Sequence, residues 1–316
     1  MTTHLPAYGG AGWSPRTASL RDELGHVWAP CGLDREWTPL EAVLLHRPGP
    51  ELGSVDDPES ALMLERPDAV RAGAQHDDVA AAYRDAGVAV HYIDPPVDPS
   101  PNLVYAADLF VMTPEGAILG RPASSVRAGE ERWVQRRLAE LGVPIVRAVG
   151  GTGTFEGADA MWLDERTVLL GLGLRTNSEG AAQVAAVLAS MGVEIIMVAL
   201  PPGTMHLMGQ LRIVDRDLAF YWSGRLADDG VRALERHGYK ALPIPDDEEA
   251  RRRFALNFVT LGPRRVLMAT GCPASQAAYE AEGVVCTTVE VDEIVKAAGG
   301  IGCLTGILRR SSGGEE

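Results

Sequence analysis

The stretch Ser190-Met-Gly192-Val-Glu-Ile-Ile-Met-Val198 joins the end of a helix-like segment to a run of strand-forming residues. A glycine directly after a helix is the usual left-handed stop, and a β-branched run behind it is typical of a strand. The same junction recurs along the chain, and its successive glycines are 55, 50, 46 and 45 residues apart. These glycines are Gly87, Gly142, Gly192, Gly238 and Gly283. The junctions therefore indicate an internal repeat.

Two short apolar runs around a turn precede each of the four later helices. The turns contain Pro-Glu-Gly, Asp-Glu, Asp-Arg-Asp and Gly-Pro, which are residues that favour tight turns. The paired runs occupy residues 109–119, 160–170, 211–220 and 258–268. The first copy shows only the run Val43–His46 clearly, and an insertion rich in Pro, Gly and Asp follows at about 47–66. Each copy thus predicts a strand, a turn, a strand, a helix and a strand.

Five such copies predict an α/β fold with radial repetition, namely a five-bladed pseudo-symmetric α/β propeller of strand-strand-helix-strand modules. The alternative is an ordinary α/β sandwich in which the spacing is a coincidence. In a ring, equivalent strands converge on a central channel. Residues at the start of each module would then meet there despite their wide separation in the sequence.

The domain organisation follows from where the repeat begins and ends. We expect a single propeller domain over residues 39–310. Residues 1–38 are rich in Gly, Pro and Trp without periodicity, so they are expected to form an irregular N-terminal arm on the surface of the fold. Residues 311–316 are expected to form a flexible tail. The insertion at 47–66 is either a lid over the channel mouth or an ordinary surface loop.

Composition is that of a globular protein and excludes several function classes. The chain has 316 residues and a net charge of −14 without an evident basic face, which argues against nucleic acid as a partner. No apolar run is long enough for a membrane span, and the first residues lack the features of a secretory signal. Four widely spaced cysteines without a CxxC pair favour a cytoplasmic location over disulfides or structural zinc. The sequence leaves the oligomeric state, including a homo-oligomer, open.

Chemically distinctive residues stand at the starts of the modules. They are Asn102, Asp108, Phe155-Glu156-Gly-Ala-Asp159, Met205-His206-Leu-Met208 and Asn257. The last module closes with Lys296-Ala-Ala-Gly-Gly-Ile-Gly-Cys303, whose glycines would let a substrate approach the thiol closely. Taken singly, the acids could be loop caps, the histidine a core residue and the cysteine a buried structural thiol. Their common position in the repeat favours a single site.

With these motifs the sequence resembles the guanidino-group-modifying superfamily of arginine deiminases, dimethylarginine dimethylaminohydrolases and amidinotransferases. The resemblance covers roughly residues 40–310. It is carried by an Asn with an Asp six residues on, a Glu-Gly-x-Asp, a His-Leu and a Gly-rich C-terminal cysteine, in that order. The fold of this superfamily is the five-bladed α/β propeller, which agrees with the repeat.

The resemblance implies that Cys303 is the nucleophile and His206 the general acid and base, while Glu156 and Asp108 are the carboxylates that bind the guanidinium. The chemistry supports this set, because a planar cation is best held by carboxylates that accept paired hydrogen bonds, which leaves its face open to a thiolate. Attack and protonation of the departing amine would leave an S-alkylthiouronium on Cys303, which water then cleaves. No metal and no organic cofactor is implied.

Three further positions concern substrate choice. Arg127 and Arg175 each lie 19 residues after one of the two acids, where arginine-using members grip the α-carboxylate of the substrate; either could instead be a surface charge. The residue matching Asn102 helps to hold the amino-acid end. Deiminases and amidinotransferases carry an Asp two residues after the histidine, whereas this chain has Met208, and dimethylarginine hydrolases also lack the acid. A less charged wall at Met208 would leave room for a methyl or hydroxyl substituent on the guanidinium.

Three functions are compatible with these residues. The first is a cysteine-dependent C–N hydrolase that converts arginine, or an Nω-methyl- or Nω-hydroxyarginine, into citrulline plus ammonia or an amine. The second is an amidinotransferase that passes the amidino group of arginine to an amine acceptor. The third is a non-catalytic propeller that retains its pocket as a binding module. The expected partner is a small-molecule guanidino amino acid.

Overall fold

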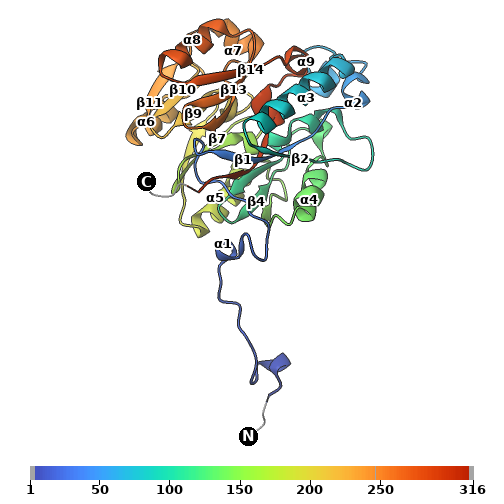
Figure 1. Ribbon diagram of the computed structural model, residues 1–316, viewed down its shortest axis with the longest axis vertical. Helices are drawn as coiled ribbons and strands as arrows, with labels where there is room; N and C mark the ends of the chain where they lie inside the picture. Colours follow the sequence, from blue (N-terminus) through green and yellow to red (C-terminus); the bar gives the residue numbers. More distant parts are fainter. Residues whose placement is uncertain (1–3, 246, 313–316) are drawn as a thin grey trace.

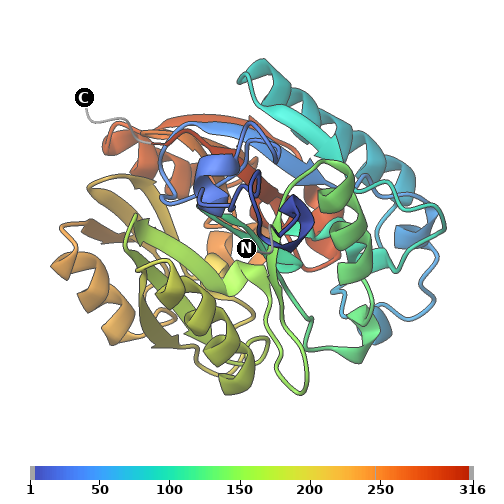
Figure 2. The ribbon, with the colours of Figure 1, turned by 90° about the horizontal axis from the view of Figure 1, so that it is seen from below.

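The computed structural model describes residues 4–245 and 247–312, and these form five three-stranded sheets. In every sheet the middle strand pairs antiparallel with one neighbour and parallel with the other. The orders are β15-β1-β2, β3-β4-β5, β6-β7-β8, β9-β10-β11 and β12-β13-β14. Five identical topologies confirm the five-bladed α/β propeller that the repeat predicts, and Figure 2 shows the modules arranged around a common centre.

The strands are short, as expected for modules that repeat about every 50 residues. They are β1 (Leu40–Leu45), β2 (Ala89–Tyr92), β3 (Phe110–Thr113), β4 (Gly116–Leu119), β5 (Ile145–Ala148), β6 (Ala160–Asp164), β7 (Thr167–Leu172), β8 (Glu194–Ala199), β9 (Leu211–Asp215), β10 (Leu218–Tyr221), β11 (Lys240–Pro243), β12 (Val259–Gly262), β13 (Arg265–Ala269), β14 (Val285–Val289) and β15 (Gly306–Arg310).

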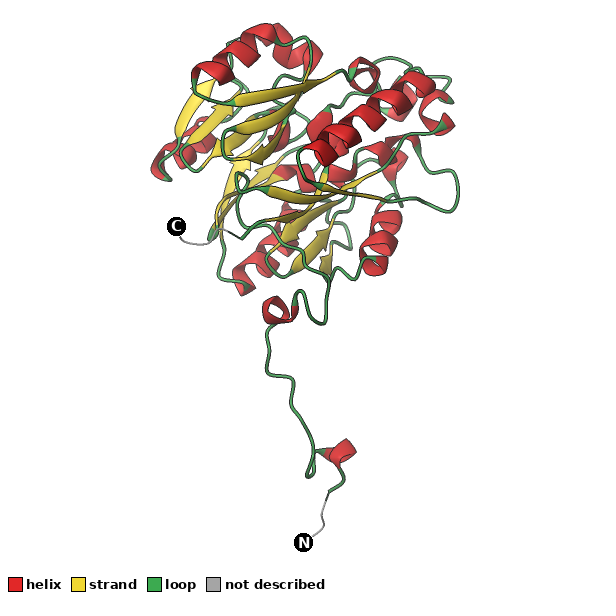
Figure 3. Ribbon diagram, in the orientation of Figure 1, coloured by secondary structure: helices red, strands yellow, loops and turns green. Residues whose placement is uncertain are grey.

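A helix connects the two parallel strands of every sheet, and Figure 3 shows these helices on the outside of the strands. They are α3 (Ala69–Asp85), α4 (Glu131–Glu140), α5 (Ser178–Ser190), α6 (Asp228–Arg236) and α8 (Pro273–Ala281). The glycine predicted to stop each one has φ between 74° and 82°, a left-handed conformation that a side chain would strain. Among the described helices, none is both long and apolar enough to cross a lipid bilayer.

Shorter helices lie in the N-terminal arm and in connections within and between modules. The α-helices are α1 (Leu20–Glu23), α2 (Pro50–Gly53), α7 (Asp247–Arg253), α9 (Asp292–Lys296) and α10 (Ile301–Leu304). The 3-10 helices are η1 (Pro6–Tyr8), η2 (Glu59–Ala61), η3 (Pro101–Val104), η4 (Ala106–Asp108), η5 (Ser125–Arg127), η6 (Gly157–Asp159) and η7 (Leu207–Gly209). Among them, η4 contacts η6 and α10, and η6 contacts η7. The starts of the modules therefore converge, as the repeat predicts.

The ring places its most apolar strands inside. The first strands β3 and β12 are buried along their whole length, whereas the third strands β5 and β14 are partly exposed. Around the centre, β15 contacts β3, β12 contacts β9, and β1 contacts β12. Strand β15 pairs with β1 and so completes the first module with the C-terminal end of the chain. The sequence showed only one of the two antiparallel strands of this module because the other lies more than 250 residues away.

Residues 4–38 carry the short helices η1 and α1, and the first part of this arm is not placed as expected. Residues near Gly32 lie along β15, because Gly32 donates to Leu308 O and its own carbonyl accepts from Arg310 N. The first part of the arm instead projects away from the ring (Figure 1) and carries exposed Tyr8 and Trp13. The expectation that the whole arm lies on the surface is therefore wrong. Of the tail predicted at 311–316, residues 313–316 lie outside the described part of the chain.

Candidate active site

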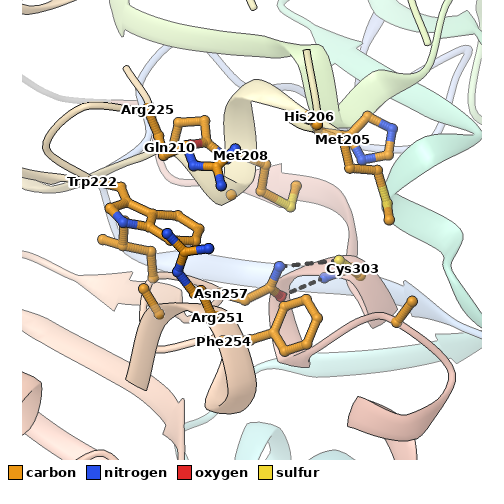
Figure 4. A pocket seen from close by; sticks show the side chains of 15 residues that line it. Met205, His206, Met208, Gln210, Trp222, Arg225, Arg251, Phe254, Asn257 and Cys303 are labelled. Carbon is orange, nitrogen blue, oxygen red and sulfur yellow. Dashed lines mark hydrogen bonds between the residues drawn. The ribbon is translucent and has the colours of Figure 1, made fainter. Parts of the chain in front are cut away.

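Cys303 lies in α10 at the centre of the ring, and Asn257 holds it from two sides. Asn257 Nδ2 donates to Cys303 Sγ at 3.1 Å, and Cys303 N donates to Asn257 Oδ1 at 3.0 Å (Figure 4). The glycines before the cysteine allow this fit, since a Cβ at Gly299 would lie 2.2 Å from a ring carbon of Tyr105. The Gly-rich loop is thus shaped by close packing, and Asn257 fixes the direction of the thiol.

His206 and Glu156 form a buried pair beside this loop. His206 Nε2 lies 2.7 Å from Glu156 Oε2, and its Nδ1 lies 3.7 Å from Asp108 Oδ1. Glu156 is fully buried, and His206 and Asp108 are nearly so. Asp159, to which sequence reasoning gave no role, accepts from Leu207 N at 3.0 Å and from Thr176 Oγ1 at 2.6 Å. Asp159 therefore anchors the backbone that carries the imidazole.

Arg127 is enclosed behind Asp108. Its Nη1 donates to Asp108 Oδ2, its Nε donates to Glu130 Oε2 at 2.9 Å, and its Nη2 donates to Asn102 O at 3.2 Å. These three contacts show that Arg127 fixes Asp108 in place. A contact of Arg127 with the α-carboxylate of a substrate stays a prediction. Asp108 Oδ1 has no hydrogen-bond partner among the described residues and remains an open acceptor.

Arg175 and Asn102 lie close to the carboxylates without lining the cavity described below. Arg175 Nη1 donates to Glu156 Oε1 at 3.3 Å. The Asn102 side chain donates to Ala61 O at 2.8 Å, which ties the 47–66 insertion to the site. This insertion also donates from Leu64 N to the carbonyl of Lys296, at the start of the cysteine loop. A substrate-binding role for Arg175 and Asn102, and a lid at 47–66, stay predictions.

A cavity of about 250 Å³ opens onto both Cys303 and His206. Figure 4 shows the thiol and the imidazole at one end of it, with Trp222, Arg225 and Arg251 at the other. The remaining side chains on its wall are mostly apolar, and they include Met205, Met208, Leu256 and Phe254. The two residues are 97 positions apart in the chain, yet they face the same space. Met208 lines the cavity, and its role as the wall of a substituent pocket stays a prediction.

Sequence reasoning missed the cationic end of the cavity. The guanidinium carbons of Arg225 and Arg251 lie 5.3 Å and 5.9 Å from the centre of the Trp222 ring. Arg225 lies between β10 and α6 of the fourth module, and Arg251 lies in α7, between the fourth and fifth modules. Neither carries a motif, so no sequence signal distinguished them from surface arginines. Asn257 had a signal, because it occupies the same position in its module as the acids and the histidine.

The electrostatics favour an imidazolium–carboxylate pair. Burial tends to lower the pKa of His206, but the Asp108 charge and the hydrogen bond with Glu156 outweigh it and raise this pKa to about 9. Burial tends to raise the pKa of Glu156, yet the hydrogen bond and charge of His206 bring it to about 2. Burial and Asp108 raise the pKa of the Cys303 thiol. His206 is therefore charged near neutral pH, while the thiol needs a further positive charge to ionise.

Asp108, Glu156 and His206 also have the spacing of a metal site, with one ligand atom from each within 4.8 Å of the others. However, Arg127 donates to Asp108, and its Nη1 lies 3.7 Å from Glu156 Oε2. Glu156 is moreover bonded to His206. The Arg127 guanidinium already supplies the positive charge that a metal ion would bring, so this cluster does not fit a metal ion and we derive no metal chemistry from it.

A five-module propeller with these groups at its centre is the arrangement of the guanidino-group-modifying superfamily. Residues 74–239 match the arginine deiminase family, and the chain belongs to that family.

Individual relatives agree with this assignment. The N(G),N(G)-dimethylarginine dimethylaminohydrolase of Streptomyces coelicolor is 27% identical over 286 residues, which cover 86% of this chain and 98% of that protein. The Pseudomonas aeruginosa protein of the same name is 26% identical over 242 residues, or 77% of this chain and 90% of that protein.

Solved structures show the same fold. A cysteine-to-serine mutant of the Pseudomonas aeruginosa enzyme in complex with citrulline superposes with a TM-score of 0.72 at 24% identity, covering 86% of this chain and 100% of that one. SxtG, an amidinotransferase of saxitoxin biosynthesis from Microseira wollei, has a TM-score of 0.73 at 16% identity, covering 91% of this chain and 99% of that one.

Proposed function

We propose that the protein is a cysteine-dependent hydrolase of an Nω-substituted arginine, which it converts to citrulline and an amine. The observation that carries the proposal is that Cys303 and His206 face one cavity while Asp108 and Glu156 stand directly behind the imidazole. The dimethylarginine dimethylaminohydrolases of Streptomyces coelicolor and Pseudomonas aeruginosa described above support the choice of a methylated arginine. The same site would act on arginine itself, with ammonia as the departing group.

The guanidinium of the substrate would bind between the sulfur and the carboxylates. Asp108 Oδ1 is a buried acceptor without a hydrogen-bond partner among the described residues, so it can take an N–H of the cation. Binding a cation beside Cys303 offsets the burial that raises the pKa of the thiol, which then loses its proton to solvent. The thiolate attacks the guanidinium carbon and forms a tetrahedral intermediate.

His206 would act in both halves of the reaction. As an imidazolium it donates a proton to the substituted nitrogen, because an amine cannot leave as an anion, and the C–N bond then breaks. A planar thiouronium remains on Cys303. The neutral imidazole next takes a proton from water, whose oxygen adds to the same carbon. Cleavage of the C–S bond returns the thiolate, the added oxygen loses its second proton to solvent, and the neutral ureido product leaves.

Met208 is the proposed determinant of substrate choice. Replacement of Met208 by aspartate would add a carboxylate to the cavity wall, and a charge-assisted hydrogen bond to an unsubstituted guanidinium nitrogen contributes about 1.5–3 kcal/mol. We therefore expect the kcat/KM ratio of arginine to Nω,Nω-dimethylarginine to rise by roughly 10- to 100-fold. Met205→Asp adds the same charge to a more exposed wall residue and should leave this ratio near the wild-type value. If Met208→Asp leaves this kcat/KM ratio unchanged, Met208 does not determine the choice of substrate.

An amidinotransferase would share the first half of this chemistry and differ in what resolves the thiouronium. The likeness to the SxtG structure keeps this second candidate open at the level of the fold. Product analysis separates hydrolysis from amidino transfer. The protein is incubated with arginine, Nω-methylarginine or Nω,Nω-dimethylarginine, each with and without glycine or lysine as the acceptor amine. Citrulline that forms without the acceptor amine supports hydrolysis. Product that requires the acceptor and carries its amidino group supports transfer, and no turnover of any guanidine would favour a binding module.

Arg175 is the proposed contact for the α-carboxylate of the substrate, and Asn102 positions the neighbouring insertion. We also propose a reducing, cytoplasmic setting. This rests on the wide spacing of the four cysteines, which include no CxxC pair.

A further inference from the structure

A second buried cation, Arg212 on β9, lies near Cys303 and has no part in the chemistry derived so far. Its side chain is 7% exposed, and its Nε donates to Leu256 O at 3.0 Å. Its Nη2 is buried without a hydrogen-bond partner among the described residues. A buried guanidinium with an unused donor is unfavourable unless a nearby group compensates its charge. The groups that face Arg212 therefore indicate what it does.

Gly302 brings Arg212 against the cysteine loop. A Cβ at Gly302 would lie 1.9 Å from Arg212 Nη2 and 2.9 Å from Asn257 Oδ1. The φ of Gly302 is not in the left-handed region, so the glycine is needed here for space and not for backbone conformation. The guanidinium thus packs on the main chain of the residue directly before Cys303, where any side chain would push it away.

Arg212 approaches from the side of the ring opposite to substrate. It lines a separate central cavity of about 50 Å³, together with Glu36 of the N-terminal arm, and does not line the larger cavity in front of Cys303. Met208 lines both spaces and so lies between them. Glu36 accepts from Trp162 N at 3.1 Å, which fixes a carboxylate on the far side of the guanidinium.

The titratable groups around the two residues define the electrostatic balance at the sulfur. Burial and Asp108 raise the pKa of the Cys303 thiol, whereas the Gly300 backbone, Asn257 and Arg212 lower it. Tyr105 also interacts with Cys303, and His206 faces it across the larger cavity. The charged or titratable groups around Arg212 are Glu36, Cys303, Tyr83, Tyr279 and Arg310. Arg212 is thus a fixed positive charge that acts on the sulfur whether or not substrate is bound.

We propose that Arg212 is a positioning residue for the Cys303 nucleophile, a fixed cation behind the Gly302 peptide that stabilises negative charge on the sulfur. The inference rests on the proposed role of Cys303 as nucleophile. Negative charge develops on the sulfur twice, before attack and again when the C–S bond breaks. The substrate cation helps only the first time, because the departing ureido product is neutral. Arg212 supplies the positive charge for the second.

The test compares Arg212→Gln with Arg310→Gln, a matched loss of a second buried arginine that also faces Glu36. The readout is the pH profile of Cys303 alkylation by iodoacetamide without substrate, followed on the Cys303 peptide by mass spectrometry. We expect Arg212→Gln to slow alkylation at pH 8 about tenfold and to move the profile to higher pH. Arg310→Gln should leave the profile in place, and Arg212→Lys should restore part of the rate.

A profile for Arg212→Gln that coincides with wild type, in a protein whose unfolding transition remains cooperative, would overturn the inference. Gly302→Ala provides a second test if Arg212→Gln does not fold. The added methyl group displaces the Arg212 guanidinium but keeps its charge in the protein. The alkylation profile of this variant should also move to higher pH. Alkylation does not require turnover. A shifted profile in a protein that hydrolyses no guanidine would therefore support the inference and contradict only the proposed function.

Discussion

Replacing Cys303 by serine is expected to lower hydrolysis of any accepted guanidine by roughly 10⁴-fold or more, because a hydroxyl is a far weaker nucleophile than a thiolate. The fold should survive, since a hydroxyl oxygen can accept the hydrogen bond that Asn257 Nδ2 gives to Sγ. Citrulline formation measures the first effect and a denaturant unfolding curve the second. Cys286→Ser removes a half-buried cysteine outside the site and is the matched control. Substantial activity in Cys303→Ser would remove this residue from the mechanism.

Replacing Glu156 by glutamine is expected to lower kcat by roughly 10²- to 10³-fold, because His206 loses the partner that keeps it protonated for leaving-group protonation. Stability near pH 6 should fall by about 3 kcal/mol, since one charge of a buried pair is left without its partner. Both effects come from one hydrogen bond, so they should appear together. Steady-state kinetics and urea unfolding at several pH values test them.

The loss of stability in Glu156→Gln should depend on pH in a defined direction. The pKa of His206 is raised above its ordinary value to about 9, so its contribution to wild-type stability is full below about 6.5 and is lost as pH rises through about 9. The stability gap between wild type and Glu156→Gln should therefore be largest near pH 6 and shrink toward pH 9. Glu130→Gln removes another buried carboxylate, one that pairs with Arg127, and should not move the NMR titration of His206. A gap that widens with pH would contradict the assignment.

Much of the architecture could be predicted because it depends on local chemistry. The fold depends on signals within short segments. These are the glycines that stop the five helices, the turn residues of the hairpins and the order of apolar and helix-like segments, and each formed the element expected. The convergence of Asp108, Glu156, His206 and Cys303 followed from symmetry, because equivalent positions of equivalent modules meet at the centre of a ring.

What could not be predicted depends on long-range packing. Nothing in the sequence around Arg127 indicates that its guanidinium donates to Asp108, Glu130 and the carbonyl of Asn102. The contact of Arg212 with Gly302 joins residues 90 positions apart, and only the folded ring brings them together. The N-terminal arm has no periodicity to predict from, and its projection from the ring could not be derived from composition.

The central claim is that Cys303 carries the substrate carbon, and trapping that carbon on the sulfur tests it most directly. S-Methylthiocitrulline carries a thiolate leaving group that needs no proton from His206, so attack should proceed in His206→Gly while hydrolysis, which needs the imidazole, is slow. After acid quenching, the account predicts a single thiouronium adduct on the Cys303 peptide of His206→Gly and none in Cys303→Ser. An adduct on another residue, or none at all while wild type still turns the compound over, would contradict it.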